Sequence, residues 1–158
     1  MRRTFARRLK QEISQNDDIC LISADLGFNL WDDIKEQYPA QFINPGAAEQ
    51  LMIGMAVGMA LEKKIPVCYS ITPFLLYRPF EFIRNYLHHE KIPVKLVGGG
   101  RNDDYKTLGH THWAQEDEEI VSVLDNIHTF RPENADELEE MFEEFLFSNE
   151  PCYLNLKR

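Results

Sequence analysis

Hydrophobic positions follow two different periods along this chain. Phe5, Leu9 and Ile13 recur at helical spacing, which predicts an amphipathic helix over about residues 4–15. The short apolar run at residues 20–23 is typical of a buried strand. The same patterns predict further helices near residues 30–38, 49–63, 79–89, 116–124 and 135–148, and further strands at residues 42–43, 66–69, 93–97, 127–130 and 152–156.

The alternation of strands with helices predicts the fold class. Successive strand–helix–strand units form right-handed crossovers and build a mostly parallel sheet with helices on both faces. We therefore expect an α/β protein, a three-layer α/β/α sandwich, folded as a single domain over residues 1–158. Ligands of such folds bind outside the carboxyl ends of the strands. Those ends are predicted at residues 25–27, 44–49, 70–77 and 98–112, which hold most of the unusual chemistry.

Composition narrows the class of partner and compartment. The net charge of −9 argues against nucleic acid or an anionic membrane as a partner. Cys20, Cys68 and Cys152 lie in apolar, strand-like settings without CxxC spacing, which is typical of reduced core cysteines. The basic N-terminus is not followed by the apolar segment of a secretion signal, and no apolar run is long enough to span a bilayer. These features predict a soluble, cytoplasmic protein.

Glu49 lies two residues before the start of an unusual apolar stretch. Residues 51–61 read LMIGMAVGMAL, without a charge or a hydroxyl group. A helix that is apolar all round belongs in a core or an interface, and a carboxylate at its start is costly unless it has a partner. Spacing alone leaves two interpretations open: a first-turn carboxylate that is stabilised by the helix dipole and reaches water, or a functional carboxylate.

Aromatic residues precede the helix predicted at residues 79–89. Phe74 and Tyr77 fall just before Pro79, a residue suited to the first turn of a helix. They are either core packing or a stacking platform for a planar ring. Arg78 and Glu81 are spaced as a helix-entry ion pair.

A second polar cluster contains His110 and His112. No HExxH helix or cysteine pair accompanies them, so we expect no metal site. Hydrogen bonding or proton transfer to a substrate is one interpretation of these imidazoles, and donation to the backbone is the other. The glycines at residues 98–100 lack GxGxxG spacing, so we expect them to allow close approach of a ligand or a partner's backbone.

Six segments together resemble a known family. In chain order they are SADL at residues 23–26, QFINPGAAEQ at 41–50, the stretch 70–85 that ends in RPFEFIRN, IPV at 92–94, GHTHWAQED at 109–117 and PCYL at 151–154. They resemble the pyrimidine-binding domain of transketolase-type thiamine diphosphate enzymes, and the resemblance covers essentially the whole chain.

The resemblance implies roles for particular residues. A glutamate at the position of Glu49 hydrogen-bonds a ring nitrogen of the cofactor's aminopyrimidine and promotes loss of the thiazolium C2 proton, so Glu49 is expected to be both catalytic and cofactor-binding. His112 matches a catalytic histidine that contacts the substrate. Phe74 matches the aromatic residue that stacks on the pyrimidine. Tyr77 is expected to flank that ring, and Asp25, at the end of the first predicted strand, to line the same pocket.

Two positions depart from the usual family pattern. His110 replaces a small residue or proline and is expected to face the substrate, whereas Leu108 replaces an acidic residue that often touches a sugar hydroxyl. These departures make the usual sugar-phosphate substrates doubtful.

The chain also lacks family elements. It contains no Gly-Asp-Gly followed at a distance by Asn, the usual magnesium–diphosphate motif, and it ends at residue 158 without a further domain. We therefore expect a split enzyme, in which a separate diphosphate-binding subunit completes the thiamine diphosphate site and holds most of the contacts to Mg²⁺. The small residues at 54–58 are expected to allow close approach of that subunit.

The expected assembly is a heterotetramer with two copies of each subunit. The expected reaction is transfer of a two-carbon ketol unit between sugars or related small carbonyl compounds. Two alternatives stay open at this point. The chain is otherwise a subunit of a split thiamine diphosphate-dependent 2-oxoacid decarboxylase, or a non-catalytic domain that acts as a binding module.

Overall fold

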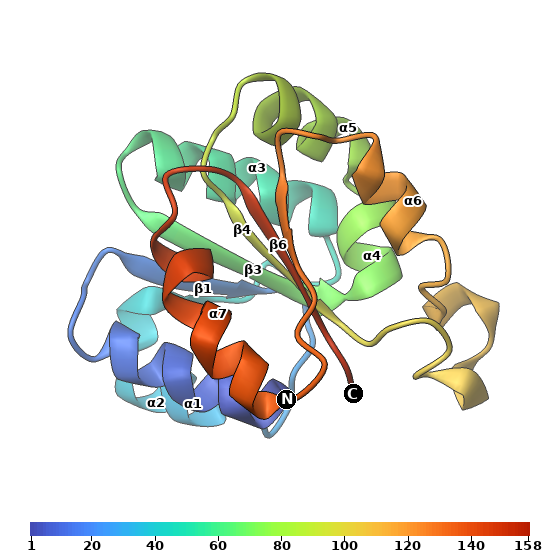
Figure 1. Cartoon of the computed structure of the whole chain (residues 1–158). Helices are drawn as coiled ribbons and strands as arrows, with labels where there is room; N and C mark the ends of the chain where they lie inside the picture. The colour runs from blue at the N-terminus through green and yellow to red at the C-terminus, as the bar shows by residue number, and fades with distance from the viewer.

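A parallel sheet forms the middle layer of the protein, whose structure is a computed structural model of residues 1–158 (Figure 1). Its strand order is β2-β1-β3-β4-β6-β5, and every neighbouring pair is parallel. The expected α/β class is therefore confirmed. The strands are β1 (Ile19–Ser23), β2 (Phe42–Ile43), β3 (Ile65–Ile71), β4 (Lys95–Gly99), β5 (His128–Phe130) and β6 (Cys152–Leu156).

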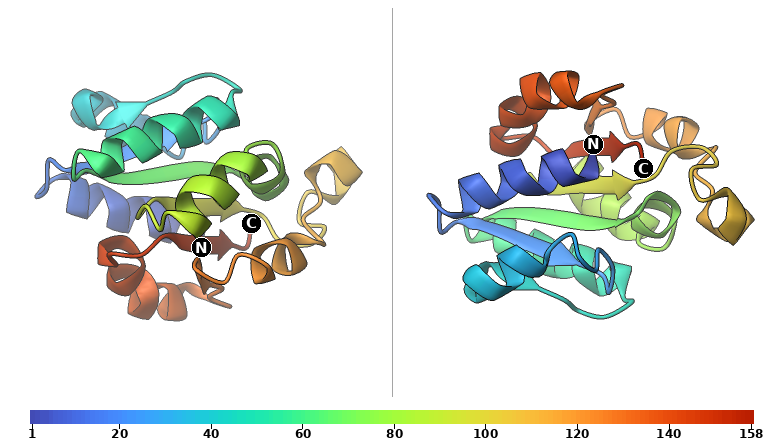
Figure 2. Two further views of the ribbon diagram at one scale, coloured as in Figure 1. Left: turned by 90° about the horizontal axis from the view of Figure 1, so that it is seen from above. Right: turned by 90° about the horizontal axis from the view of Figure 1, so that it is seen from below.

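Helices cover both faces of this sheet, which confirms the expected three layers (Figures 1 and 2). None of these helices combines the length and the apolar composition that a membrane-spanning helix needs. One face carries α1 (Arg2–Ile13), α2 (Asp32–Gln37) and α7 (Ala135–Phe147), and the other carries α3 (Glu49–Leu61), α4 (Thr72–Tyr77), α5 (Phe80–Phe82), the π-helical segment η2 (Ile83–His89) and α6 (Asp117–Ser122). The short 3₁₀ turns are η1 (Pro39–Gln41), η3 (Lys106–Leu108) and η4 (His110–His112).

Alternation along the inner strands supplies two hydrophobic cores. Leu21 of β1 and Val67 of β3 belong to the core under α1 and α7, whereas their neighbours Ile22 and Cys68 belong to the core under α3 and α4. Successive side chains of a strand point to opposite faces, so a strand covered on both faces reads as a continuous apolar run. All three cysteines are buried and unpaired, as expected.

Helix α4 is the main difference from the predicted elements. The sequence pattern predicts no helix before Pro79, yet Thr72–Tyr77 is helical with a proline in its first turn. That proline, Pro73, has its φ angle preset for a helix start, which explains why the chain turns helical at the end of β3. Beyond Pro79 the chain forms a three-residue α5 and then π-helical turns, not the single helix expected over residues 79–89. Phe74 and Tyr77 therefore lie on a helix and not on a loop.

Gly98 and Gly99 are the last two residues of β4, and their role differs from the expected one. A Cβ atom at Gly98 would lie 2.6 Å from Oγ1 of Thr72, and one at Gly99 would lie 2.7 Å from the Tyr69 hydroxyl. Real Cβ atoms do not approach other atoms so closely. These two glycines make room for side chains of the same chain, so the expectation of a nearby ligand or partner backbone is wrong for them.

Residues 101–115 extend from the carboxyl edge of the sheet (Figure 2). An antiparallel bridge between Asn102 and Ala114 closes the base of this segment. Predicted as a polar loop, it contains the two 3₁₀ turns η3 and η4, and the second of these carries the histidines.

Candidate active site

Three of the predicted site residues meet at the carboxyl edge of the sheet. Glu49 is the first residue of α3, Phe74 lies in α4, and His112 ends η4. The rings of Phe74 and His112 pack edge to face with their centroids 4.9 Å apart. Arg78 connects the remaining side chain, because its guanidinium contacts both Glu49 and Phe74. Glu49, Phe74 and His112 thus form one cluster, although they come from distant parts of the chain.

Glu49 is a buried carboxylate with a charged partner. It is 2% exposed, and Nη1 of Arg78 donates to its two oxygens at 2.8 and 2.9 Å. The Ser70 hydroxyl lies at a longer 3.4 Å. Glu49 does lie in the first turn of α3, but it does not reach water, so that part of the first interpretation is wrong. So is the predicted ion pair between Arg78 and Glu81, because an unpaired buried carboxylate is far costlier than an unpaired exposed one.

The space between Glu49 and Phe74 accepts a planar nitrogen-bearing group. The guanidinium carbon of Arg78 lies 3.8 Å from the centroid of the Phe74 ring while the same group donates to Glu49. A flat cation can therefore stack on the aromatic ring and bind the carboxylate at once. The aminopyrimidine of thiamine diphosphate is likewise flat and carries nitrogen atoms at its edge. The donor and acceptor chemistry of these residues fits that ring.

The two histidines of η4 differ in their surroundings. Nδ1 of His112 lies 3.0 Å from the Thr111 hydroxyl, and its ring packs against Phe74. His110, at the start of the same turn, is exposed and is not part of the Phe74 contact. The structure contains no group of three or more His, Cys, Asp or Glu side chains that could hold a metal ion. Only His112 is joined to the cluster.

Tyr77 lies on α4, three residues beyond Phe74, and points toward α6. Its hydroxyl is 3.4 Å from Oε2 of Glu116. Burial, and secondly the Glu116 carboxylate, raise the pKa of Tyr77 to about 12. The tyrosine is therefore a neutral hydrogen-bond donor at physiological pH.

Asp25 pairs with Asn44 and lies outside the cluster of Glu49, Phe74 and His112. It has a φ angle of +51°, in the left-handed region, and its backbone N–H donates to Oδ1 of Asn44 at 3.0 Å. The Asn44 amide returns a bond of 3.3 Å to the Asp25 carboxylate. This pair joins the loops after β1 and β2, and no hydrogen bond or ion pair links Asp25 to Glu49 or His112.

A buried polar network that was not predicted from the sequence lies beneath the cluster. Asp117 is fully buried, and its Oδ2 atom accepts hydrogen bonds from Arg131, Tyr153 and Asn155 at 2.9, 2.9 and 3.1 Å. Burial, and secondly the Asp117 carboxylate, raise the pKa of Tyr153. The sequence did contain a signal for this network: Asn155 is a polar residue in the otherwise apolar strand CYLNL.

The network also holds the start of α4. The Asn155 amide donates to Oγ1 of Thr72 at 3.2 Å, and the Thr72 hydroxyl donates to the carbonyl oxygen of Gly100 at 2.6 Å. Thr72 is the first residue of α4, two positions before Phe74, and Gly100 begins the segment that carries His112. Both sides of the candidate site are therefore tied to the last strand.

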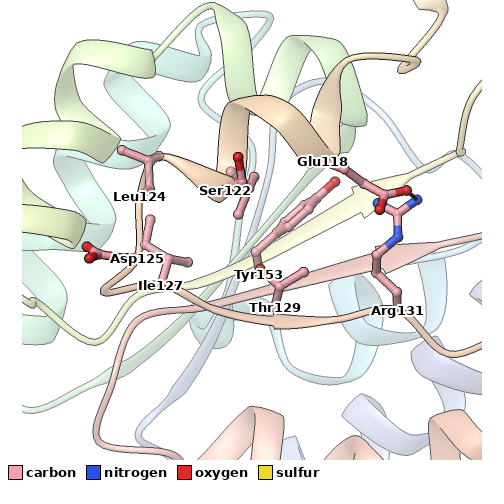
Figure 3. Close-up of a pocket in the computed structure, with 9 residues that line it drawn as sticks. Glu118, Ser122, Leu124, Asp125, Ile127, Thr129, Arg131 and Tyr153 are labelled. Carbon is pink, nitrogen blue, oxygen red and sulfur yellow. Dashed lines mark ion pairs between the residues drawn. The ribbon is translucent and has the colours of Figure 1, made fainter.

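The largest cavity lies on the far side of this network. It measures about 370 Å³ and lies between α6, β5 and β6, where Leu124, Ile127 and Tyr153 supply apolar lining. Arg131 pairs with Glu118 at 2.8 Å across one end of it (Figure 3). No predicted site residue lines this cavity, so it is separate from the Glu49 cluster.

Comparison with known families identifies the relatives of this chain. The family profile described as "Transketolase, pyrimidine binding domain" matches residues 1–158. The chain belongs to this family. Membership implies dependence on thiamine diphosphate at the level of the family. The resemblance inferred from the QFINPGAAEQ and GHTHWAQED segments is thereby confirmed.

Several curated relatives of this family member are subunits of split transketolases. It is 28% identical to a 6-deoxy-6-sulfo-D-fructose transketolase subunit from a Clostridium species, over 100% of the chain and 49% of the relative. It is 29% identical to an apulose-4-phosphate transketolase subunit from Actinobacillus succinogenes, over 77% of the chain and 39% of that protein. The chain thus spans about half the length, or less, of these relatives.

A solved structure agrees with this kinship. A split-gene transketolase, described as an inactive β4 tetramer, is 28% identical and superimposes with a TM-score of 0.85 over 98% of this chain and 50% of that one. Transketolase from Campylobacter jejuni, at 19% identity, shares the fold with a TM-score of 0.88 over 99% of this chain and 25% of that one.

Proposed function

We propose that this chain is the pyrimidine-binding part of a split, thiamine diphosphate-dependent transketolase-like enzyme that transfers a two-carbon ketol unit between sugar-type substrates. One observation carries the proposal: a single planar group, the guanidinium of Arg78, contacts both the buried Glu49 carboxylate and the face of the Phe74 ring. When bound, thiamine diphosphate would supply a carbon nucleophile for the carbonyl chemistry of ketol transfer. The residues of this chain bind, orient and move protons around it.

Glu49 is proposed to hold a proton at a ring nitrogen of the aminopyrimidine. Its burial supports this role, because a hydrogen bond to a carboxylate is stronger where water is excluded. General acid–base assistance of this kind contributes about 10²–10⁴-fold to rate. Phe74 is proposed to stack on the ring and so fix its orientation toward Glu49.

His112 is proposed to contact the oxygen atoms of the substrate. Its Nδ1 atom lies beside the Thr111 hydroxyl, which leaves Nε2 for the substrate. An imidazole nitrogen can donate a hydrogen bond to, or accept one from, a hydroxyl group of the substrate. His110, exposed on the same turn, extends this substrate-facing edge, while Tyr77 and Asp25 are proposed to line outer parts of the cofactor site.

A second, diphosphate-binding subunit is proposed to complete the site and to hold Mg²⁺, in a heterotetramer with two copies of each subunit. The relatives named as transketolase subunits support a partner. So does α3, whose outer face exposes 54% of Leu51 and 67% of Leu61. Gly58 on this helix has open space around it, whereas the space at Gly54 is taken by the Phe82 ring of the same chain, 3.2 Å from a Cβ built there.

The proposal is tested by reconstitution. The partner is identified by copurification from the native source, and the complex is supplied with thiamine diphosphate, Mg²⁺ and candidate ketoses. Ketol transfer to an aldehyde acceptor is expected. Release of carbon dioxide from 2-oxoacids without ketol transfer would favour the decarboxylase alternative, and a complex with neither activity would favour a binding module.

A further inference from the structure

Arg78 occupies the space that the proposed cofactor ring requires. Its Nη1 atom donates hydrogen bonds to both carboxylate oxygens of Glu49 at 2.8 and 2.9 Å, and its guanidinium carbon lies 3.8 Å from the centroid of the Phe74 ring. An aminopyrimidine that binds Glu49 and stacks on Phe74 needs the same two contacts. Stacked planar groups lie one van der Waals layer apart, so the guanidinium and the ring exclude each other.

The arginine resembles that ring in its chemistry. A guanidinium is planar, stacks on aromatic faces and presents N–H donors that match a carboxylate. No other basic side chain contacts Glu49. Arg78 therefore makes with Glu49 and Phe74, within one chain, the two contacts that the site would offer to an aminopyrimidine.

The burial of the two partners is unequal. Glu49 is 2% exposed, whereas the side chain of Arg78 is 46% exposed. A buried carboxylate without a partner destabilises a fold, so Arg78 stabilises the chain while the site holds no ligand. The exposed side of the arginine gives its long, flexible stem a route into solvent. Releasing it costs the ion pair but does not require the core to open.

We propose that Arg78 is an internal placeholder for the aminopyrimidine, and that cofactor loading displaces it. The inference rests on the proposed function of Glu49 and Phe74. On loading, Glu49 exchanges one planar nitrogen partner for another, and the Arg78 side chain turns toward water. With an internal competitor, the apparent affinity equals the intrinsic affinity multiplied by the fraction of molecules whose site is free. Contacts between the cofactor and the partner subunit then favour the bound cofactor over Arg78, so cofactor loading depends on assembly of the complex.

The affinity of the reconstituted complex for thiamine diphosphate with Mg²⁺ tests the placeholder directly. Arg78→Met keeps the length of the stem and removes the guanidinium, so it is expected to tighten binding at least tenfold. Arg84→Met, on the same segment, is the matched control, because Arg84 is exposed and bonds only to Asn85. Its affinity is expected to equal that of the wild type.

The outcomes separate the two proposals. Equal or weaker binding by Arg78→Met, with a wild-type complex that does bind, overturns the placeholder and leaves the proposed function intact. A wild-type complex that fails to bind thiamine diphosphate overturns the proposed function, and the placeholder with it.

A second measurement follows Arg78 itself. The side-chain Nε–H resonance of Arg78, assigned by its loss in Arg78→Met, is recorded by nitrogen NMR in the wild-type complex. Saturating thiamine diphosphate is expected to move it to the position of a solvent-exposed arginine such as Arg84. A resonance that does not change while the cofactor binds shows that Arg78 stays on Glu49, and this overturns the proposal.

Discussion

Asn155 on the last strand donates a hydrogen bond to Thr72 at the start of α4, with Nδ2 and Oγ1 3.2 Å apart. The same amide nitrogen lies 3.1 Å from the Asp117 carboxylate at the start of α6. One buried side chain therefore ties together the two helices that border the candidate site. The placement of Phe74 depends on residues at the centre of the sheet as well as on its own neighbours.

Substitution of Asp117 tests the importance of this network. Asp117→Ala removes the acceptor shared by Arg131, Tyr153 and Asn155 and leaves buried donors unpaired. Breaking a buried ion pair in this way costs about 3–5 kcal/mol of unfolding free energy. Denaturant unfolding measures it, with Glu119→Ala, an exposed residue of the same helix, as the control. Equal stability of both variants would show that the network contributes little.

Two glycine substitutions are predicted to have opposite effects. Gly98→Ala places a methyl group 2.6 Å from Oγ1 of Thr72 and is expected to destabilise the fold by about 1–3 kcal/mol. Gly58→Ala lies in the interior of α3, where the new methyl group meets no atom within 4 Å apart from its chain neighbours and the backbone of the helix, and is expected to stabilise the isolated chain by about 0.5–1 kcal/mol. Thermal or denaturant unfolding measures the change in the free energy of unfolding of each variant. The account is contradicted if both changes shift stability in the same direction.

Tyr77 predicts an alkaline loss of stability. Burial, and then Glu116, raise the pKa of its phenol from 10.0 to about 12. Between these pH values the unfolded chain loses the proton while the folded chain keeps it, so the free energy of unfolding falls as the pH rises. This contribution is complete below pH 10 and is lost by about pH 12. Tyr77→Phe is expected to flatten the decline in that window, and parallel pH profiles would contradict the assignment.

The outer face of α3 is predicted to matter for assembly but not for folding. Leu51→Lys and Leu61→Lys place charges at positions that are already exposed, so the isolated chain is expected to keep its unfolding free energy. Burying the new charges against a partner is costly. Binding of the partner subunit, measured by calorimetry, is expected to weaken at least tenfold. Val123→Lys, exposed at the C-terminal end of α6, serves as the control, and equal affinities would place the interface elsewhere.

The regular elements of this fold were largely predictable from the hydrophobic pattern. The periodicity of Phe5, Leu9 and Ile13 indicates α1, and the apolar run at residues 152–156 indicates β6. Helix α4 was not predictable in this way. It is a single turn and a half of mostly buried residues, and so short a segment shows no contrast between an apolar and a polar face.

The candidate site was predictable in its residues but not in its contacts. The motifs around Glu49, Phe74 and His112 identified three side chains that the fold does bring together. The partner of Arg78 was predicted wrongly, because sequence spacing favours its near neighbour Glu81 and says nothing about which carboxylate is buried. The role of Asn155 depends on long-range contacts with Thr72 and Asp117, which no local pattern reveals.

The proposed role of Glu49 is tested most directly by exchange of the C2 proton of thiamine diphosphate bound to the reconstituted complex. Glu49→Gln keeps the size and shape of the side chain but removes the carboxylate that is proposed to hold the proton at the aminopyrimidine. The account predicts an intact fold and assembly, with C2–H exchange slowed by about 100-fold or more. Exchange at a rate close to that of the wild type would contradict it.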